Sequence, residues 1–401
     1  MTKENKKYNY LIVGGGMAAD QAVAGIRSID KGGTIGIISA DIDEPYARPA
    51  LSKKLWVDPD FHDEDIDFHT AQKYNAEITL ATRVIKIIPE KHIVKTDKGE
   101  EYAYDKLLLA TGSEAKALKG ESSERVVALR SKQDYLKIRK FSGKGKHVIV
   151  VGNGYIGSEI AAGLIQSDTK VSLVITGDRI FDKKFPIFLS EKYEQKYLAA
   201  GIKIYHNSKA SGYELVGDGV KVQLNDGTVL QGAGLVLGIG AFTDYSLASA
   251  AGLEVDEHGV IVDEQLKTTA ADIWAAGDII SYPDQILSRQ SAGHVRHAIN
   301  SGLFVGKQMA GETGIYDYTP VFYSWVFDIN WEAFGNVNSG LKMYAEKLGD
   351  EQYIVYYFDK NILAGVLSWS SDVNLGHLKG ILKKQPTVEE LNKVVKLEAV
   401  E

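Results

Sequence analysis

The chain has 401 residues, which is enough for two or three domains with sizeable cores. Its composition, 44% hydrophobic and 25% charged residues, excludes a disordered or fibrous chain, and its net charge of −7 argues against nucleic-acid binding. The sequence holds no cysteine, so disulfides, thiolate metal sites, iron–sulfur ligation and Cys-x-x-Cys redox relays are excluded. Any redox chemistry must therefore use a bound cofactor.

An internal repeat organises the first part of the chain. YLIVGGGMAADQAVAGI at 10–26 recurs as VIVVGNGYIGSEIAAGL at 148–164, an offset of 138 residues. In each copy a β-branched apolar run ends at a Gly-x-Gly-x-x-(Ala/Gly) motif, and apolar residues then recur at helical spacing. The motifs comprise Gly14, Gly16 and Ala19 in the first copy and Gly152, Gly154 and Gly157 in the second. Both copies predict a strand, a glycine turn and a helix.

Such a turn opens a dinucleotide-binding βαβ unit. The first glycine makes the turn, and the second lets the main chain approach a pyrophosphate. The small third residue lets the helix pack on the strand while the helix N-terminus faces the anion. A single motif of this kind also occurs as a purely structural strand-to-helix turn. Because the motif occurs twice in the right context, we predict two dinucleotide sites.

Further short strands follow in chain order. The second strands of the two units are predicted at 34–39 and 170–175. Three more apolar runs end in turns that we expect to close the two sheets: 106–110 before Thr111 and Gly112, 235–237 before Gly238 and Gly240, and 273–276 before Gly277 and Asp278. From about Thr319 the sequence changes to aromatic alternation, followed by an amphipathic stretch at 387–397. This last part predicts a mixed α+β domain.

A carboxylate that binds the adenosine ribose is expected just past the second strand of each unit. Asp41 stands there in the first unit and Asp178 in the second, although neither falls cleanly at the strand end. A solvated loop aspartate is an equal alternative for both. Arg179, Lys183 and Lys184 follow Asp178, so a 2′-phosphate could be accommodated, and the choice between NADH and NADPH stays open.

Several segments resemble one family along nearly the whole chain. They are VGGGMAAD, EPYARPALSK (44–53), LLLATGS (107–113), VGNGYIGSEIA (151–161), IWAAGDI (273–279), GHVRHA (293–298), PVFYS (320–324) and the C-terminal YIVYYFDKNILAGVLSW. With them the sequence is similar to FAD-dependent pyridine-nucleotide oxidoreductases of the ferredoxin reductase, monodehydroascorbate reductase and apoptosis-inducing factor type. The ARPALSK segment is the specific part, because disulfide reductases of similar fold carry paired cysteines in that region.

The resemblance implies that the first glycine motif holds FAD and the second holds NADH or NADPH. The implied FAD residues beyond the motif are Asp41, Arg48, Lys53, Val84, Thr111, Gly112, Asp278, His294 and Tyr323. Those implied for the nicotinamide cofactor are Tyr155, Ile156, Glu159, Asp178, Gly238 and Gly240. Arg48 offers a guanidinium fork to a pyrophosphate, and Asp278 at a strand end can accept from ribitol hydroxyls. The structural alternatives are a solvated arginine, a cap before a possible helix at Asp278, and ordinary aromatic packing of Tyr323.

Lys53, Glu159 and His294 are the predicted catalytic residues. The resemblance places Lys53 beside the reactive edge of the flavin and Glu159 beside Lys53, where an ammonium near N5 favours the negative charge gained on reduction. The residues alone also allow a solvent-facing lysine and a glutamate that favours the first turn of a helix. His294 is implied to contact the flavin, with a packed polar core residue as the alternative. Gly293 and Arg296 depart from the acidic residues that are usual at these two positions.

We expect an α/β fold with two Rossmann-like nucleotide-binding domains, one inserted in the other, and a C-terminal α+β domain. The motif order puts the FAD-binding domain at 1–120 and 252–317, the NAD(P)H-binding domain at 121–251 and the C-terminal domain at 318–401. No metal is expected, because the acidic stretch 58–69 shows no ligand spacing. We expect no membrane span and find no signal-peptide pattern, so the protein is predicted to be cytoplasmic.

The resemblance implies a FAD-dependent NAD(P)H oxidoreductase that passes hydride from NAD(P)H to the flavin and then electrons to a ferredoxin- or rubredoxin-type protein or a small acceptor. Two alternatives remain: a monodehydroascorbate or quinone reductase, and a redox-sensing interaction protein like apoptosis-inducing factor. The expected partners are NAD(P)H and one such acceptor, without nucleic acid, and the protein is expected to be a monomer or a homodimer. With no cysteine relay, electrons must leave directly from the reduced flavin.

Overall fold

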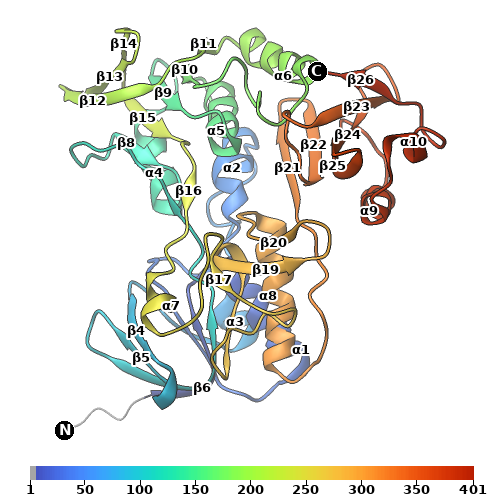
Figure 1. Ribbon diagram of the computed structural model, residues 1–401. Coiled ribbons are helices and arrows are strands. Elements are labelled where there is room, and N and C mark those ends of the chain that lie inside the picture. Colours follow the sequence, from blue (N-terminus) through green and yellow to red (C-terminus); the bar gives the residue numbers. More distant parts are fainter. Residues whose placement is uncertain (1–5) are drawn as a thin grey trace. The chain divides into compact units, whose positions relative to one another are not determined.

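The computed structural model describes residues 6–401, and this part of the chain separates into two compact units (Figure 1). Unit 1 consists of the described residues up to Arg48 together with Asp63–Glu114 and Phe242–Pro320. Unit 2 consists of Pro49–His62, Ala115–Ala241 and Val321–Glu401. The short strands β7 (Glu114–Ala115) and β16 (Ala241–Phe242) stand where the chain passes from one unit to the other. The finer division into three domains at the predicted boundaries stays a prediction.

Unit 1 is built on a mostly parallel sheet. Its strands are β1 (Lys6–Val13), β2 (Ile35–Ile38), β3 (Glu77–Thr79), β4 (Val84–Ile88), β5 (Ile93–Thr96), β6 (Glu101–Leu109) and β18 (Ile273–Ala275). The order is β3-β2-β1-β6-β5-β4, with β18 pairing along the second half of β6. β4 pairs with β5 and β5 with β6 in antiparallel fashion at one edge, while the remaining pairs are parallel.

A smaller sheet and four helices complete unit 1. The sheet has the order β17-β19-β20, with β17 (Val260–Ile261), β19 (Ile280–Asp284) and β20 (Ser288–Gln290). The helices are α1 (Met17–Ile29), α3 (Thr70–Tyr74), α7 (Ser246–Ala250) and α8 (Val295–Met309). Helices α1 and α8 pack closely, because Gly302 and Gly306 of α8 let its backbone approach α1: a Cβ at Gly306 would lie 2.1 Å from the carbonyl oxygen of Ala22.

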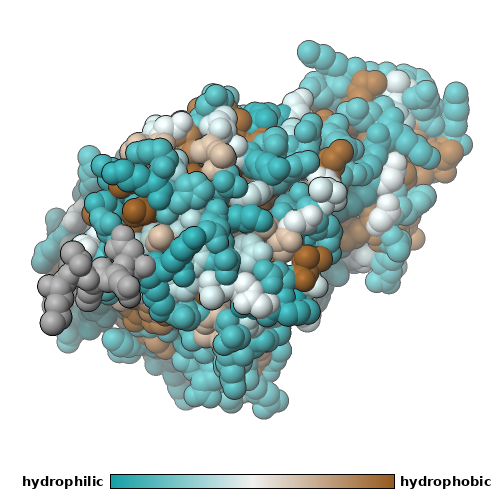
Figure 2. Space-filling model, turned by 90° about the horizontal axis from the view of Figure 1, so that it is seen from below, coloured by the Kyte–Doolittle hydropathy of each residue, from teal (hydrophilic) through white to brown (hydrophobic). Residues whose placement is uncertain are grey.

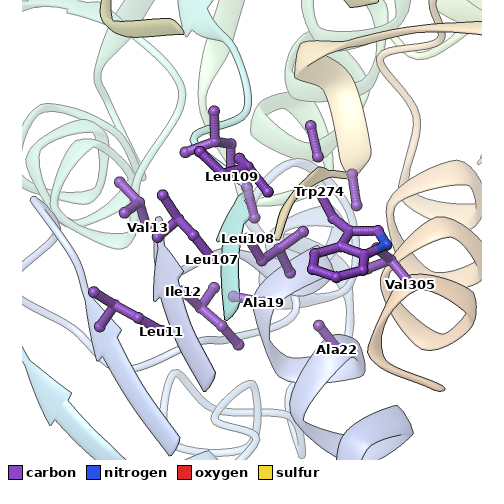
Figure 3. Close-up of a cluster of buried hydrophobic side chains, with 14 of the residues drawn as sticks. Leu11, Ile12, Val13, Ala19, Ala22, Leu107, Leu108, Leu109, Trp274 and Val305 are labelled. Atoms are coloured by element: carbon purple, nitrogen blue, oxygen red, sulfur yellow. The ribbon is translucent and has the colours of Figure 1, made fainter. Parts of the chain in front are cut away.

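The core of unit 1 lies between the main sheet and helices α1 and α8 (Figure 3). β1 ends in the buried residues 11–13 and β6 in the buried residues 107–109. Ala19 of α1, Trp274 of β18 and Val305 of α8 are buried in the same cluster. Near-continuous apolar strands are typical of a parallel sheet that is covered on both faces. This explains why a strong apolar run precedes each glycine motif.

Unit 2 contains three sheets. The parallel sheet has the order β11-β10-β9-β15-β8, with β8 (Val126–Ala128), β9 (His147–Val151), β10 (Lys170–Val174), β11 (Lys203–Tyr205) and β15 (Gly234–Leu237). A small antiparallel sheet joins β12 (Ala210–Val216), β13 (Gly219–Leu224) and β14 (Val229–Gly232). The larger antiparallel sheet has the order β21-β22-β25-β24-β23-β26, with β21 (Val321–Val326), β22 (Ile329–Gly335), β23 (Lys342–Lys347), β24 (Tyr353–Asp359), β25 (Ile362–Trp369) and β26 (Glu398–Val400).

The helices of unit 2 are α2 (Lys54–Val57), α4 (Lys132–Phe141), α5 (Tyr155–Gln166), α6 (Ile187–Ala199), α9 (Leu375–Lys384) and α10 (Val388–Leu391). Helix α5 follows the second glycine motif, and it packs against β9 and β10 and contacts β21 of the antiparallel sheet. The Rossmann-like sheet and the C-terminal sheet therefore both contact this one helix.

The predicted α/β fold is confirmed, because each glycine motif joins a parallel strand to a helix. The second strands predicted at 34–39 and 170–175 are β2 and β10, shorter by one or two residues. Two stretches contain less helix than their local patterns allow. No α-helix follows Asp278: a single 3-10 turn, Gly277–Ile279, leads into β19, which pairs on both sides with β17 and β20. Of the stretch 387–397 only Val388–Leu391 is helical, because the chain then returns to pair with β23 as β26.

The surface that Figure 2 shows is mainly hydrophilic, with hydrophobic residues in small separate groups. The exposed large apolar side chains come from distant parts of the sequence and include Trp325, Ile315 and Val394. Within residues 6–401, no helix combines the length and the hydropathy needed to cross a bilayer.

Candidate functional site

The first glycine cradle stands between β1 and α1 in unit 1. Gly14 has a φ of +113°, and a Cβ there would lie 2.2 Å from the carbonyl oxygen of Ala110, just past the end of β6. Only glycine fits so close an approach of two strand ends. The backbone N–H of Gly14 donates to the carbonyl oxygen of Ile38 in β2 at 2.9 Å, which closes the turn on its other side. Ala19 of α1 is fully buried against the sheet.

The second cradle, between β9 and α5 in unit 2, repeats this geometry. Gly152 has a φ of +145°, and a Cβ there would lie 2.2 Å from the carbonyl oxygen of Gly238, just past β15. Its N–H donates to Val174 of β10 at 3.0 Å. A Cβ on Gly157 would lie 2.4 Å from the Gly152 carbonyl oxygen, so the three glycines pack backbone on backbone. Gly240, with a φ of +103°, follows in the same turn.

The middle glycine of each cradle faces open space. A Cβ on Gly16 or on Gly154 would meet no atom within 4 Å. Both residues are N-caps, of α1 and α5, so no side chain caps the N–H groups of either first turn. Free N–H donors, the positive end of a helix and room for a ligand together suit an anion. Each cradle therefore fits the pyrophosphate of a dinucleotide.

Residues from two other strand ends gather around the first cradle. A Cβ on Gly14 would lie 2.9 Å from the backbone nitrogen of Thr111, and Gly112 follows with a φ of +71°. The hydroxyl of Ser113 donates to Oδ2 of Asp278 at 2.7 Å. The structure thus brings Gly14, Thr111, Gly112 and Asp278, four of the residues implied for FAD, to one edge of the sheet. Asp278 caps no helix, so its alternative structural role is absent.

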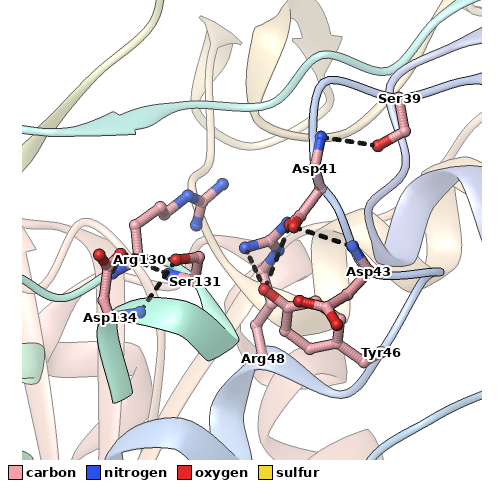
Figure 4. A network of polar contacts seen from close by, with 8 residues as sticks. All are labelled: Ser39, Asp41, Asp43, Tyr46, Arg48, Arg130, Ser131 and Asp134. Carbon is pink, nitrogen blue, oxygen red and sulfur yellow. Dashed lines mark hydrogen bonds and ion pairs between the residues drawn. The ribbon is translucent and has the colours of Figure 1, made fainter. Parts of the chain in front are cut away.

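Asp41 and Arg48 form one polar network in unit 1 (Figure 4). Nη2 of Arg48 lies 3.1 Å from Oδ2 of Asp41, and Nη1 donates to the hydroxyl of Tyr46 at 3.0 Å. The Tyr46 hydroxyl donates to Asp41 at 3.3 Å. The backbone N–H of Ala81 donates to the Asp41 carbonyl oxygen at 2.8 Å, which holds the chain just before Val84 beside this network. Neither Asp41 nor Arg48 is a solvated loop residue, because each holds the other.

The loop after β10 is tied to the second cradle. Asn153, between Gly152 and Gly154, donates through Nδ2 to the Arg179 carbonyl oxygen at 2.9 Å and to Oδ1 of Asp182 at 3.0 Å. Its Oδ1 accepts from the N–H of Phe181 at 3.1 Å. Oδ2 of Asp182 accepts from the N–H of Asp178 at 3.0 Å. The predicted ribose residue Asp178 is therefore held to the cradle although it lies beyond the end of β10.

A cavity of about 550 Å³ opens beside this loop, lined by Asp178, Arg179, Glu191, Glu194, Gln195, Leu198 and His206. Nη2 of Arg179 lies 2.9 Å from Oε1 of Glu191. Nε2 of His206 lies 2.8 Å from Oε1 of Glu194. Arg179 and His206 of the cavity lining thus each have a carboxylate partner, and Asp178 adds a third carboxylate.

Tyr155 begins α5 and packs among aromatic rings of unit 2. The centre of its ring lies 5.4 Å from that of Phe181 and 5.5 Å from that of Trp331. The ammonium of Lys184 lies 5.6 Å from the Tyr155 ring centre, and burial lowers the pKa of Lys184. Lys184 is therefore turned toward Tyr155 and does not line the cavity at Asp178. Ile156, the next residue of α5, is exposed.

Lys53 and Glu159 form an ion pair in unit 2. Nζ of Lys53 lies 2.6 Å from Oε2 of Glu159, and the carboxylate is only 2% exposed. Two serine hydroxyls donate to the same carboxylate: Ser52 to Oε2 at 2.6 Å and Ser324 to Oε1 at 2.7 Å. The ammonium of Lys53 also lies 5.8 Å from the ring centre of Tyr323. The two residues are in contact as expected, while their role toward a flavin stays a prediction.

Two histidines of α8 differ in environment. His294 is the N-cap, and its Nδ1 accepts from the N–H of Arg296 at 3.3 Å, so it has a structural task whether or not it contacts a flavin. His297 is fully buried, with its Nδ1 3.1 Å from the Tyr316 hydroxyl. Burial lowers the pKa of His297 to about 4, against the opposing effect of the Asp278 carboxylate. His297 is therefore neutral at physiological pH.

Sequence reasoning missed four polar residues at these sites: Ser52, Ser113, Asn153 and Ser324. Ser113 and Asn153 lie inside the recognised motifs, directly beside a glycine, and that position could have singled them out. Ser52 precedes Lys53 in the ALSK segment. No local signal marks Ser324, because its partner Glu159 is 165 residues away in the chain.

The acidic stretch at 58–69 does not assemble a metal site. Within residues 6–401, no three His, Asp or Glu side chains come together in a way that could hold a metal ion.

Comparison with known proteins agrees with this geometry. The chain is 27% identical over 432 residues to apoptosis-inducing factor 1, mitochondrial, of Dictyostelium discoideum, which covers 97% of this chain and 81% of that protein. It is 29% identical over 421 residues to monodehydroascorbate reductase 5 of Oryza sativa subsp. japonica, which covers 96% of this chain and 85% of that protein.

A solved structure, the covalent putidaredoxin reductase–putidaredoxin complex, matches with a TM-score of 0.87 and 26% identity, over 97% of this chain and 96% of that chain. The sequence signature of the pyridine nucleotide-disulphide oxidoreductases matches residues 8–302, which span both glycine cradles, Lys53, Glu159 and Asp278. The chain therefore belongs to the pyridine nucleotide-disulphide oxidoreductase family.

Proposed function

We propose that this protein is a flavin-dependent NAD(P)H oxidoreductase that holds FAD in the cradle of unit 1 and a nicotinamide cofactor in the cradle of unit 2. The observation that carries the proposal is the shared geometry of the two cradles. In each, the first glycine closes on a neighbouring strand end, and the middle glycine leaves open space before an uncapped helix N-terminus. Two anion cradles of one design suit two dinucleotides.

The residues of unit 1 suit the parts of FAD. The first turn of α1 would hold the pyrophosphate, and Asp278, oriented by Ser113, would accept hydrogen bonds from ribitol hydroxyls. Arg48 would face the anion with a guanidinium that Asp41 holds in place. The cradle of unit 2 would hold the pyrophosphate of the nicotinamide cofactor at the first turn of α5.

When bound, the two cofactors supply hydride transfer from the nicotinamide C4 to the flavin N5, and the flavin then releases electrons. The chain contributes binding, orientation and charge. Glu159 holds the Lys53 ammonium at 2.6 Å, and we assign to this ammonium the role of favouring negative charge at the flavin. With no cysteine in the sequence, no thiol of the protein can accept the electrons.

A small redox protein of the ferredoxin or rubredoxin type is the acceptor that we propose. The likeness to the putidaredoxin reductase–putidaredoxin complex extends over 97% of this chain, at 26% identity, and supports this choice. The similarity to a monodehydroascorbate reductase supports a small-molecule acceptor as the second candidate. A redox-sensing role like that of an apoptosis-inducing factor is the third, and it predicts slow reoxidation and NADH-dependent dimerisation.

We further propose NADH as the preferred nicotinamide cofactor. Ile175, the first residue after β10, is buried and apolar, so the recognition of the adenosine ribose falls to the loop that carries Asp178. Beside this loop Arg179 is already paired with Glu191, and three carboxylates line the cavity. A 2′-phosphate would meet this negative charge, whereas a ribose hydroxyl can donate to it.

Anaerobic stopped-flow experiments test the proposal. The FAD-loaded protein is mixed with NADH or NADPH, and the reduced protein is then mixed with ferredoxin, rubredoxin, a quinone, the monodehydroascorbate radical or oxygen. We expect faster flavin reduction by NADH and the fastest reoxidation by one of the two redox proteins. Failure of the purified protein to retain FAD would refute the cofactor assignment. Slow reoxidation by every acceptor, together with NADH-dependent dimerisation, would favour the redox-sensing role.

A further inference from the structure

Glu159 is a buried charge whose surroundings go beyond a simple ion pair. Its carboxylate accepts from Lys53, Ser52 and Ser324 at 2.6 to 2.7 Å. Both serines are themselves buried, at 3% and 1% exposure. A buried hydroxyl costs free energy unless it is hydrogen bonded, and a buried carboxylate costs far more. Glu159, Lys53, Ser52 and Ser324 therefore form one satisfied polar cluster inside unit 2, which we call the Glu159 clamp.

The two oxygens of Glu159 are held differently. Oε2 receives both the Lys53 ammonium and the hydroxyl of the adjacent Ser52. Oε1 receives the hydroxyl of Ser324, which comes from β21 in the C-terminal sheet. Loss of Ser52 would leave Oε2 with the lysine, whereas loss of Ser324 would remove the hydroxyl donor at Oε1. Ser324 is therefore the more sensitive member of the clamp.

The residue pattern of β21 supports a specific role for this serine. Val321, Ser324 and Val326 are buried, while Trp325 is exposed. Ser324 thus occupies a core position, where an apolar side chain would pack without the need for a partner. It borders Tyr323, whose ring lies 5.8 Å from the Lys53 ammonium, so the same strand contacts both members of the ion pair.

We infer that Ser324, assisted by Ser52, is a positioning residue that holds the carboxylate of Glu159 aimed at Lys53, and thereby sets where Lys53 presents its ammonium to a bound flavin. A carboxylate that loses the donor on one oxygen is free to turn, and a turned Glu159 would no longer hold the Lys53 ammonium at 2.6 Å. The effect on the flavin rests on the proposed function, whereas the effect on Lys53 is a property of unit 2 alone.

The test compares Ser324→Ala with a matched control. Ser190→Ala is suited to this, because Ser190 is a buried serine of the same unit whose hydroxyl has no hydrogen-bond partner. The first readout is the rate at which Lys53 is acylated at mildly alkaline pH, followed by mass spectrometry with the exposed Lys54 as the internal reference. The second readout is the reduction potential of the bound flavin, measured by spectroelectrochemistry.

We expect Ser324→Ala to raise the acylation rate of Lys53 by at least about threefold, because a lysine that Glu159 no longer holds is more available to the reagent. The flavin potential should fall toward that of Lys53→Met, since less positive charge favours the reduced flavin less. Ser324→Thr, which keeps a hydroxyl at this position, should give the acylation rate and the flavin potential of the unmodified protein. Ser52→Ala should show the same changes as Ser324→Ala to a smaller extent. Ser190→Ala should change neither readout.

Equal Lys53 acylation in Ser324→Ala and Ser190→Ala would overturn the inference, as would a threonine variant that behaves like alanine. If Ser324→Ala does not fold, Ser52→Ala provides the same two readouts, and an unchanged Lys53 rate there would equally refute the clamp. A protein without flavin would refute the proposed function, but the acylation of Lys53 would still decide on the clamp. A changed acylation rate with an unchanged flavin potential would confine the clamp to unit 2 and contradict its role toward the flavin.

Discussion

The two glycine cradles start from nearly the same sequence and reach nearly the same backbone. In both, the first glycine lies against the carbonyl oxygen of the residue just past a neighbouring strand, 2.2 Å from where a Cβ would be. The second cradle is packed more tightly, because a Cβ at Gly157 would lie 2.4 Å from the Gly152 carbonyl oxygen, whereas Ala19 is accommodated in the first. The first glycine is therefore common to both cradles because close backbone contacts require it.

The residue between the two glycines shows the difference. Gly15 stands there in unit 1, where a Cβ would lie 2.3 Å from the hydroxyl oxygen of Ser39. Asn153 stands there in unit 2, where its amide binds the loop at 177–182 through three hydrogen bonds. The segment after the second strand of each unit thus determines which residue type fits between the two glycines. In unit 1 the strand end crowds it, and in unit 2 a polar loop uses it as an anchor.

The largest expected effect comes from a pair of substitutions in the second cradle. Gly152→Ala places a Cβ against the Gly238 carbonyl oxygen at positive φ, and should cost on the order of 3 kcal/mol or more of unfolding free energy. Gly154→Ala meets open space and should cost about 0.5 kcal/mol or less, yet its methyl group enters the space for the pyrophosphate. Thermal unfolding and NADH titration separate the two effects. Equal stability of the two variants would contradict the shared geometry.

The two units also differ in how they bury an ionisable group: Glu159 is paired in unit 2, while His297 is buried and neutral in unit 1. The pKa of His297 lies at about 4 in the folded protein against 6.5 ordinarily, so the unfolded chain binds a proton first as the pH falls. Its contribution is complete above about pH 7 and should decline by roughly 3 kcal/mol toward pH 4.

His297→Asn should remove this part of the pH dependence. The check is the free energy of unfolding in denaturant for both proteins between neutral pH and pH 4.5. If the free energy of unfolding changed with pH in the same way in both proteins, His297 would not contribute to the pH dependence of stability. Carboxylates that do not act on His297 affect both proteins alike and cancel in the difference, whereas Asp278 belongs to the effect that is measured.

Asn153→Gly gives the second cradle the residue of the first. It removes three hydrogen bonds to the loop at 177–182 and should cost about 1–2 kcal/mol. The loop amides should exchange with deuterium faster, while the amides of β9 and β10 stay protected. Unchanged exchange at 177–182 would mean that Asp182 alone anchors the loop.

The smallest expected effect concerns the cofactor choice. Glu191→Gln releases Arg179 from its ion pair at 2.9 Å and should tighten NADPH binding about fivefold relative to NADH, which corresponds to about 1 kcal/mol. Glu194→Gln is the matched control, since it removes a carboxylate from the same cavity without touching Arg179. If NADPH bound to the two variants with equal dissociation constants, the net charge of the cavity, and not the release of Arg179, would determine the preference between NADH and NADPH.

Local sequence predicted the elements well where periodicity and glycine spacing carry the information. Both strand–glycine–helix openings and their second strands lie where the patterns put them, because apolar runs and positive φ are properties of neighbouring residues. The possible helix after Asp278 does not form, because the residues that follow form β19, which pairs with β17 and β20. The role of Ser324 could not be predicted from local sequence, because its partner Glu159 is 165 residues away in the chain.

The sequence by itself therefore determined that this chain has two dinucleotide cradles, no thiol chemistry and an α/β fold. Only the tertiary structure decided how the charged residues are paired: Arg48 with Asp41, Arg179 with Glu191, and Glu159 with Lys53 and two serines. The physical reason is the distance along the chain over which the deciding contacts act. A turn is dictated by contacts over a few residues, whereas a buried charge is stabilised by donors that the fold gathers from distant segments.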